Sequence, residues 1–198
     1  MKKVSVLIAA VFAVFALVSF NNVSAEDFAV GTTLADFKLT DINGKEQSFN
    51  NLKGKNGAVL VFLSAQCPVV KSYNERINQI AAEYESKGIA FIGINANATE
   101  SLDFVKSNAA EVGYKFPVLI DKGNVLADKL GAQATPETYF FDAKNVLLYH
   151  GAIDNDKSGK AITESYLKTA FDSTLSGKKI EKSKVNAFGC SIKRLKAE

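Results

Sequence analysis

The fold of this chain is decided by the stretch Ala58-Val59-Leu60-Val61-Phe62-Leu63-Ser64-Ala65-Gln66-Cys67-Pro68. Its first six residues are continuously apolar and partly β-branched, which is typical of a strand buried on both faces in a parallel sheet. Beyond Pro68, apolar residues recur every three or four positions as far as Tyr84, so the pattern predicts an amphipathic helix. We expect that helix to end at Gly88, which can adopt the left-handed conformation of a C-cap.

The rest of the sequence continues this alternation of strands and helices. Asn43-Gly44 lies between two alternating segments and predicts an N-terminal hairpin. Thr99 or Ser101 is expected to cap a further helix, with Leu102, Val105, Ala109 and Val112 on one face. The further predicted strands cover residues 89–94, 116–121, 137–142 and 146–149, and the further predicted helices cover 125–130 and 162–175. This order indicates an α/β fold with a mixed central sheet flanked by helices.

The N-terminus has the organisation of a signal peptide. Lys2 and Lys3 precede an apolar run over residues 4–20, and Val23-Ser24-Ala25 supplies the small residues of a cleavage site. An uncleaved membrane anchor is the alternative, because the run is close to the shortest length that spans a bilayer. We expect residues 1–25 to be a signal peptide, 26–177 one domain, and 178–198 a polar, lysine-rich tail that carries Cys190 and whose charge forms a solvated surface. The protein would then be periplasmic or extracellular, with no stable membrane insertion after cleavage.

Composition excludes several classes of function. The formal net charge is +3 and falls to +1 without Lys2 and Lys3, and no basic stripe with interleaved aromatic residues is present. Nucleic acid is therefore not expected as a partner. The chain has two cysteines and one histidine, Cys67, Cys190 and His150, at separations that match no zinc-binding pattern. We predict no metal site and no bound cofactor, and we expect His150 to be an ordinary residue at a strand end.

Cys67 is the first candidate for a chemical role. It lies where a buried strand passes into a helix, and such junctions are where open α/β sheets form their sites. Unpaired N–H groups and positive potential at a helix N-terminus favour a thiolate. Pro68 fits the first turn, since its missing N–H costs little there. The alternative is that Cys67 is an inert, buried apolar residue.

Five motifs occur in order along the chain: Leu39-Thr40-Asp41-Ile42-Asn43-Gly44-Lys45, Val59-Leu60-Val61-Phe62, Cys67-Pro68, Phe116-Pro117-Val118 and Thr135-Pro136-Glu137-Thr138-Tyr139-Phe140-Phe141-Asp142. Through them the chain resembles the thioredoxin superfamily, in particular its alkyl hydroperoxide reductase / thiol-specific antioxidant (redoxin) branch and the exported thioredoxin-like oxidoreductases. The resemblance implies a thioredoxin-like fold with Cys67 as the nucleophile. It also implies a cis bond at Thr135-Pro136, which would pack beside Cys67 and help to bind an extended substrate.

The sequence departs from the family patterns near this cysteine. Val70 stands where thioredoxins carry a second cysteine, so no local disulfide can form. Peroxiredoxins carry Pro-x-x-x-Thr/Ser-x-x-Cys; Ser64 and Cys67 match the second half of this pattern, but Leu60 replaces the proline. The arginine that polarises the peroxide in that family has no obvious counterpart here. The resemblance implies that Ser64 hydrogen-bonds the thiolate or an approaching oxygen.

The second thiol of the chain is Cys190. Its setting, Gly189-Cys190-Ser191-Ile192-Lys193, resembles the ending of a peroxiredoxin-like subgroup of exported redoxins. This implies a resolving thiol that attacks a sulfenic acid or a mixed disulfide on Cys67 and forms a reversible disulfide. A permanent disulfide that fixes the tail, worth about 2–4 kcal/mol, is an equal alternative.

Two functions from different classes follow from these residues. The first is an exported thiol-dependent oxidoreductase with antioxidant activity, in which Cys67 attacks a disulfide-bearing substrate or a peroxide and an external thiol reductant regenerates the dithiol. The second is a redox-silent binding or structural module with a permanent Cys67–Cys190 disulfide. A metal-handling protein is disfavoured, since His150 is the only histidine and Cys67 has no second cysteine nearby.

Overall fold

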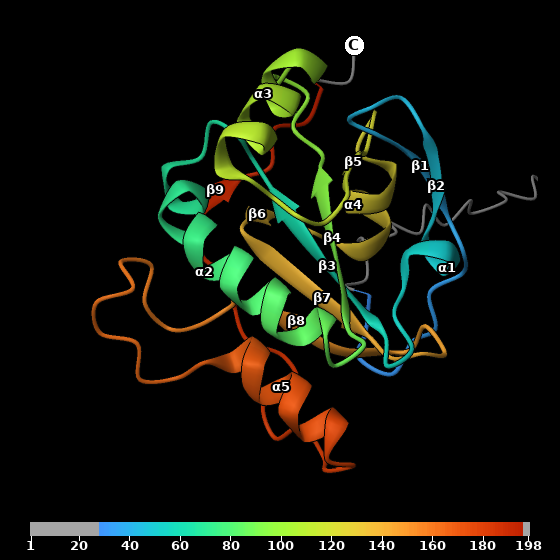
Figure 1. The fold of residues 1–198 in the computed structure, drawn as a ribbon, viewed down its shortest axis with the longest axis vertical. Helices are drawn as coiled ribbons and strands as arrows, with labels where there is room; N and C mark the ends of the chain where they lie inside the picture. Colours follow the sequence, from blue (N-terminus) through green and yellow to red (C-terminus); the bar gives the residue numbers. More distant parts are fainter. Residues whose placement is uncertain (1–27, 196–198) are drawn as a thin grey trace, which may run out of the picture.

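The computed structural model describes residues 28–195, so the predicted signal peptide, residues 1–25, lies outside the described residues. Figure 1 shows a central sheet with helices on both of its faces and a short two-stranded ribbon above it. The elements, in chain order, are β1 (Lys38–Asp41), β2 (Glu46–Ser48), α1 (Phe49–Leu52), β3 (Ala58–Leu63), α2 (Pro68–Glu85), β4 (Ala90–Asn95), α3 (Leu102–Val112), β5 (Val118–Ile120), α4 (Val125–Leu130), β6 (Ala134–Thr135), β7 (Glu137–Phe141), β8 (Leu147–Gly151), α5 (Tyr166–Leu175) and β9 (Cys190–Ser191).

The central sheet is mixed, as the alternation of elements predicts. Its strand order is β2-β1-β5-β4-β3-β7-β8. The β3–β4 and β4–β5 pairs are parallel, whereas β7 and β8 and the predicted β1–β2 hairpin are antiparallel. β3 lies inside the sheet, between β4 and β7. This position explains why all six of its residues are buried.

β3 contributes to two apolar cores, because successive side chains of a strand point to opposite faces. Val59 and Val61 pack in the core that α2 and α5 cover. Leu60 and Phe62 pack in the opposite core, which includes residues of α1 and α4. α2 lies across the first face (Figure 1) and presents to it the buried residues Val70, Tyr73, Ile77, Ile80, Ala81 and Tyr84. The predicted helical spacing therefore identifies the inward face of α2.

The ends of α2 and α3 test the predicted caps. α2 ends at Glu85 and its C-cap is Ser86, so Gly88 lies in the following turn, where its φ is 79°, and the predicted cap is wrong by two residues. α3 begins after Ser101, one of the two predicted caps. The hydroxyl oxygen of Ser101 accepts the N–H of Phe104 at 3.3 Å, which is the usual way a serine satisfies a free N–H at a helix start.

α5 begins later than predicted. The predicted helix covers residues 162–175, but α5 starts at Tyr166. Asn155 explains the difference, because its Oδ1 accepts the N–H groups of Thr163 and Glu164 at 3.0 Å and holds both residues outside the helix. None of the helices within residues 28–195 is long and apolar enough to cross a membrane.

The C-terminal tail packs against the domain, while its lysines between residues 178 and 195 are exposed, as predicted. The N–H of Val185 donates to the carbonyl oxygen of His150 at 3.0 Å, beside a parallel bridge between His150 and Lys184. Ile192 is 5% exposed and belongs to the core that contains Phe62. The tail therefore has apolar residues that pack inward between its solvated lysines, and four such residues are Ile180, Val185, Phe188 and Ile192.

We expect Leu60→Ala to lower the free energy of unfolding by about 2–5 kcal/mol, because Leu60 is fully buried and the change leaves a cavity at the centre of the sheet. Urea denaturation of the oxidised protein measures this. Val125→Ala is the matched control, since Val125 is 70% exposed, and it should change stability by no more than about 0.5 kcal/mol. Equal effects of the two substitutions would contradict the assigned core.

Candidate functional site

Cys67 is the N-cap of α2 and lies four residues beyond the end of β3. Its Sγ accepts the N–H of Val70 at 3.4 Å, and Pro68 occupies the first helical position. The residue is 2% exposed and belongs to the core beneath α2. The 18 residues of α2 thus present their positive end to this sulfur, as predicted.

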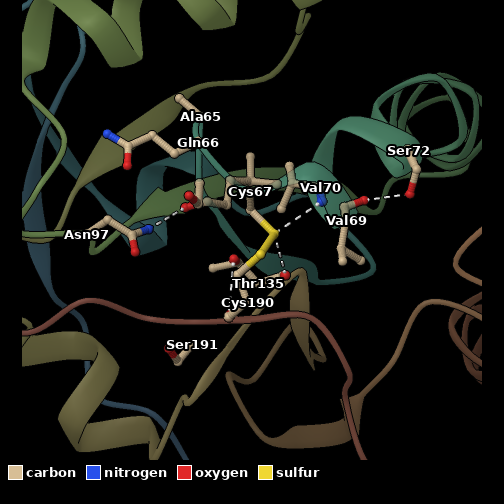
Figure 2. Close-up of a disulfide and its surroundings, with 12 residues drawn as sticks. Ala65, Gln66, Cys67, Val69, Val70, Ser72, Asn97, Thr135, Cys190 and Ser191 are labelled. Carbon is tan, nitrogen blue, oxygen red and sulfur yellow. Dashed lines mark hydrogen bonds between the residues drawn. A yellow bond between two sulfur atoms is a disulfide. The ribbon is translucent and has the colours of Figure 1, made fainter.

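The partner of Cys67 is Cys190, which lies 123 residues further along the chain, with the two Cα atoms 5.9 Å apart. Cys190 is on β9, which pairs antiparallel with β6 so that Cys190 lies opposite Thr135. Figure 2 shows the disulfide between the helix start and the tail, with Cys67 Sγ 3.3 Å from the carbonyl oxygen of Thr135. The Thr135–Pro136 bond is cis, as predicted. The predicted residues Cys67, Cys190, Thr135 and Pro136 therefore lie together.

The close approach of the tail to β6 depends on Gly189. A Cβ at this position would lie 2.0 Å from the carbonyl oxygen of Thr135 and 3.3 Å from the nitrogen of Pro136. Both are backbone atoms, which cannot move aside as the end of a flexible side chain can. Glycine is therefore required immediately before Cys190 for the tail strand to pair with β6.

The residues after Cys190 anchor the tail to two different segments of the domain. Ile192 donates its N–H to the carbonyl oxygen of Gln133 at 2.9 Å and buries its side chain in the core. Lys193 donates its N–H to Asn97 Oδ1 at 3.0 Å and accepts the N–H of Ala98 at 2.8 Å. The tail thus bridges from the β6 segment to the loop between β4 and α3.

Glu100 organises the turn between β3 and α2, and sequence reasoning missed it. Its carboxylate accepts four hydrogen bonds, from Ser64 Oγ at 2.5 Å, Gln66 N at 3.0 Å, Ala65 N at 3.1 Å and Asn95 Nδ2 at 2.6 Å. The hydroxyl of Ser64 therefore donates to Glu100 in this state, so its predicted bond to the thiolate or an approaching oxygen stays a prediction. The available signal was a carboxylate just beyond β4, the parallel neighbour of β3.

His150 is not the ordinary strand-end residue that we predicted. It is 7% exposed, its Nε2 lies 2.6 Å from Glu137 Oε1, and the ring of Tyr139 stacks on it at 4.1 Å between centroids. Glu137 Oε2 accepts the N–H groups of Gln133 and Ala134 at 2.8 and 2.9 Å. Burial alone would raise the pKa of Glu137, but the hydrogen bonds with His150 and these N–H groups outweigh it and lower that pKa. The Glu137–His150 pair therefore supports the strand that receives the tail.

Both arginines of the chain are held by carboxylates. Arg76 Nη1 donates to Asp154 Oδ2 at 2.6 Å, and its guanidinium lies 3.7 Å from the centroid of the Tyr73 ring. Arg194 Nε donates to Asp128 Oδ1 at 2.8 Å. The two guanidinium groups thus tie a loop after β8 and the end of the tail to the domain.

A cleft of about 230 Å³ opens beside the disulfide. Most of its lining residues have polar side chains, and the lining residues are Ser64, Gln66, Cys67, Asn97, Thr99, Glu100, Cys190, Ser191 and Lys193. Among the residues that the structure describes, no group of three or more histidine, cysteine, aspartate or glutamate side chains is placed to hold a metal ion. The chemistry that this cleft can reach directly is exchange at the disulfide.

Residues 30–150, more than half of the chain, match the AhpC/TSA family, so the chain belongs to this family. The fold is thioredoxin-like, as predicted. The crystal structure of a hypothetical protein from Sinorhizobium meliloti 1021 superposes with a TM-score of 0.79 at 32% identity, and covers 85% of this chain and 96% of that chain. An uncharacterized conserved protein from Geobacillus kaustophilus superposes with a TM-score of 0.81 at 29% identity, and covers 87% of this chain and 96% of that chain.

One of the curated proteins that this chain resembles has a name that states an activity. The thiol-disulfide oxidoreductase ResA of Bacillus anthracis is 31% identical to this chain over 117 residues, which are 59% of this chain and 66% of that protein. This chain therefore spans just under two thirds of the length of the curated relatives it matches. The proteins similar to this chain thus include ones named as thiol-disulfide oxidoreductases.

Gly189→Ala should loosen the tail, because the added Cβ meets two backbone atoms of the cis-proline segment. We expect the reduction potential of the Cys67–Cys190 pair to rise by about 30 mV or more, equivalent to about 1.4 kcal/mol. Equilibration with glutathione redox buffers measures the potential. Asn186→Ala is the control, since this side chain is exposed, and the reduction potential of this variant should equal that of the wild type. An unchanged potential in Gly189→Ala would contradict the packing requirement.

Glu137→Gln should destabilise the oxidised protein by about 1–3 kcal/mol at pH 7, because it removes the charge from a buried, hydrogen-bonded carboxylate. The pKa of Glu137 is lowered from 4.5 in the folded state, so its charge contributes stability that is present above that value and lost as pH falls through the folded pKa. The difference between wild type and variant should therefore shrink as the pH falls below 4.5, the ordinary pKa of a glutamate. Urea midpoints between pH 3 and pH 7 measure it, and a difference independent of pH would refute the assigned role.

Proposed function

We propose that this protein is an exported thiol-disulfide oxidoreductase in which Cys67 and Cys190 alternate between a disulfide and a dithiol. The observation that carries the proposal is the disulfide between the N-cap of α2 and the tail strand. It supplies the second thiol that the sequence lacks at Val70, three residues after Cys67. The names of the curated relatives support the same class of reaction.

The reaction divides into two exchanges. In the dithiol state, the thiolate of Cys67 attacks one sulfur of a substrate disulfide, forms a mixed disulfide and releases the other substrate sulfur as a thiolate. Cys190 then attacks the sulfur of Cys67, which releases the rest of the substrate as a second thiolate. The substrate disulfide is reduced by two electrons and the Cys67–Cys190 disulfide is formed. An external thiol reductant returns the protein to the dithiol state.

Two features support Cys67 as the nucleophile of this cycle. The N–H of Val70 points at its sulfur, and the positive end of α2 favours the thiolate. Thr135 supports a substrate-binding role for the cis-proline segment, because its backbone already pairs with one extended strand, β9. These contacts require no bound cofactor.

Export is the second part of the proposal. It rests on the basic, then apolar, then small-residue order of residues 1–25, with residues 26–177 as the domain and 178–198 as its tail. A disulfide is also the state that cysteines reach in an oxidising compartment such as the periplasm or the cell exterior.

Peroxide is the less supported substrate. When a cysteine thiolate attacks a peroxide, a positively charged group is needed to polarise the peroxide oxygens. Both arginines of the chain are already paired with carboxylates. A reduced protein that consumes peroxide rapidly would overturn this ranking while leaving the thiol cycle in place.

The test is to reduce the purified mature protein, residues 26–198, and follow its free thiols during titration with oxidised glutathione and, separately, with hydrogen peroxide. We expect Cys67→Ser to abolish turnover of the small disulfide, and Cys190→Ser to stop after one equivalent as a mixed disulfide on Cys67. Asn186→Ala, an exposed position of the tail, should turn over like the wild type.

One result would favour the redox-silent alternative. If Cys67 in the reduced protein reacts with neither oxidant faster than free glutathione does, the oxidoreductase proposal fails. The disulfide would then act only to fix the tail, and its removal should cost about 2–4 kcal/mol of stability.

A further inference from the structure

We propose that the buried pair of Glu137 and His150 positions the tail for the resolving step, in which Cys190 attacks the mixed disulfide on Cys67. This inference rests on the oxidoreductase function proposed above and assigns the pair to one of its two exchanges. Both are positioning residues, because they act on Cys190 through the backbone segments that hold the tail.

Glu137 holds the strand on which the tail is seated. Its Oε2 accepts the N–H groups of Gln133 and Ala134 at 2.8 and 2.9 Å. Gln133 also binds the tail, because its carbonyl oxygen accepts the N–H of Ile192 at 2.9 Å. Ala134 lies in β6, which pairs with the tail strand β9. The Glu137 carboxylate therefore fixes the segment against which Cys190 is placed.

His150 holds the tail at a second point, before Cys190. Its backbone N–H donates to the carbonyl oxygen of Ser183, and its own carbonyl oxygen accepts the N–H of Val185, both at 3.0 Å. The next residue, Gly151, allows this close approach, since a Cβ there would overlap the carbonyl oxygen of Val185. Cys190 therefore lies between two attachment points of the tail, one served by each member of the pair.

The pair itself is buried and joined directly. Glu137 Oε1 lies 2.6 Å from His150 Nε2, and the two residues are 5% and 7% exposed. Tyr139 contacts both, since its hydroxyl donates to Glu137 Oε1 at 3.3 Å and its ring stacks on His150. Close packing leaves little room for either side chain to move alone. The two attachment points of the tail are therefore coupled.

This coupling matters for resolution because the step is intramolecular. The Cys190 thiolate forms a bond to Cys67 Sγ, the bond between Cys67 and the substrate sulfur breaks, and the substrate leaves with the electron pair as a thiolate. Its rate depends on how often the tail holds the reacting sulfurs in line. The first exchange involves only Cys67 and the substrate, and a seated tail hinders it, since Cys67 is then 2% exposed. Loosening the tail should therefore slow the second exchange without slowing the first.

The test uses Glu137→Leu, which removes the acceptor of the Gln133 and Ala134 N–H groups. Reduced protein is mixed with oxidised glutathione, quenched with acid at millisecond to second times, alkylated and mapped without reduction. We expect the mixed disulfide of glutathione with Cys67 to accumulate and to be resolved about tenfold more slowly than in the wild type. In the Cys190→Ser background, where only the first exchange occurs, adding Glu137→Leu should not slow the reaction.

Two conservative variants test the same point if Glu137→Leu does not fold. Glu137→Gln keeps one side-chain oxygen for the two N–H groups, and His150→Gln keeps a hydrogen-bond donor for Glu137. Each should slow resolution about two- to fivefold, since it weakens the pair without removing it. Resolution at the wild-type rate in both variants overturns the inference.

Val105→Ala is the matched destabilising control. Val105 is 4% exposed and packs with Ala109 and Val118 in a small core whose described members include no residue of the tail. It should lower stability but leave the rate of resolution within about twofold of the wild type, because distant sites act independently. Equal slowing by Val105→Ala and Glu137→Leu means that general destabilisation explains the effect, and it overturns the positioning role.

Failure of the proposed function gives a different result. If Cys67 does not react with oxidised glutathione even in Cys190→Ser, the oxidoreductase proposal fails and this inference fails with it. If the mixed disulfide forms and is resolved equally fast in every Glu137 and His150 variant, only the positioning role is refuted.

Discussion

The site depends on one backbone contact, the pairing of a two-residue tail strand with the residues before a cis-proline. Thr135 lies opposite Cys190 in this pairing, and only glycine at position 189 allows the two backbones to approach so closely. Once the tail is seated there, Cys190 is brought to the N-terminus of α2. A cysteine from the far end of the chain thereby takes the place of one that could have been next to Cys67.

The carboxylates near this contact accept hydrogen bonds from backbone N–H groups. Glu100 holds the turn that leads into Cys67, and Glu137 holds the strand that pairs with the tail. Each is a carboxylate that accepts N–H groups of a segment lacking regular partners, which is how buried polar backbone is normally satisfied. The tail is in turn anchored by Ile192 in the core and by Lys193 on Asn97. The disulfide is therefore one of several bonds that keep the tail in place.

The local parts of this structure could be predicted and the long-range parts could not. The apolar run of β3, the spacing along α2 and the place of Cys67 between them are set by neighbours in sequence, so they follow from periodicity and capping. The cis bond before Pro136 followed from resemblance. The contacts of Glu100 and of the Glu137–His150 pair could not be predicted, because they join segments that only the folded chain brings together. The packing of the tail could not be predicted either, because its few buried apolar residues are scattered among many lysines.

The anchoring of the tail also affects the rate at which Cys67 could become accessible. Cys67 is 2% exposed with β9 in place, so in the proposed cycle a bulky substrate would reach it only after the tail detaches from Gln133 and Asn97. Such detachment is a local unfolding event with its own free energy, separate from that of the domain. In the dithiol state, the pace of the cycle would then be limited by how often a short strand opens, a motion that amide hydrogen exchange at Ile192 and Lys193 would record. In the proposed cycle, the exposure of the Cys67 sulfur would thus be coupled to the opening of the tail strand.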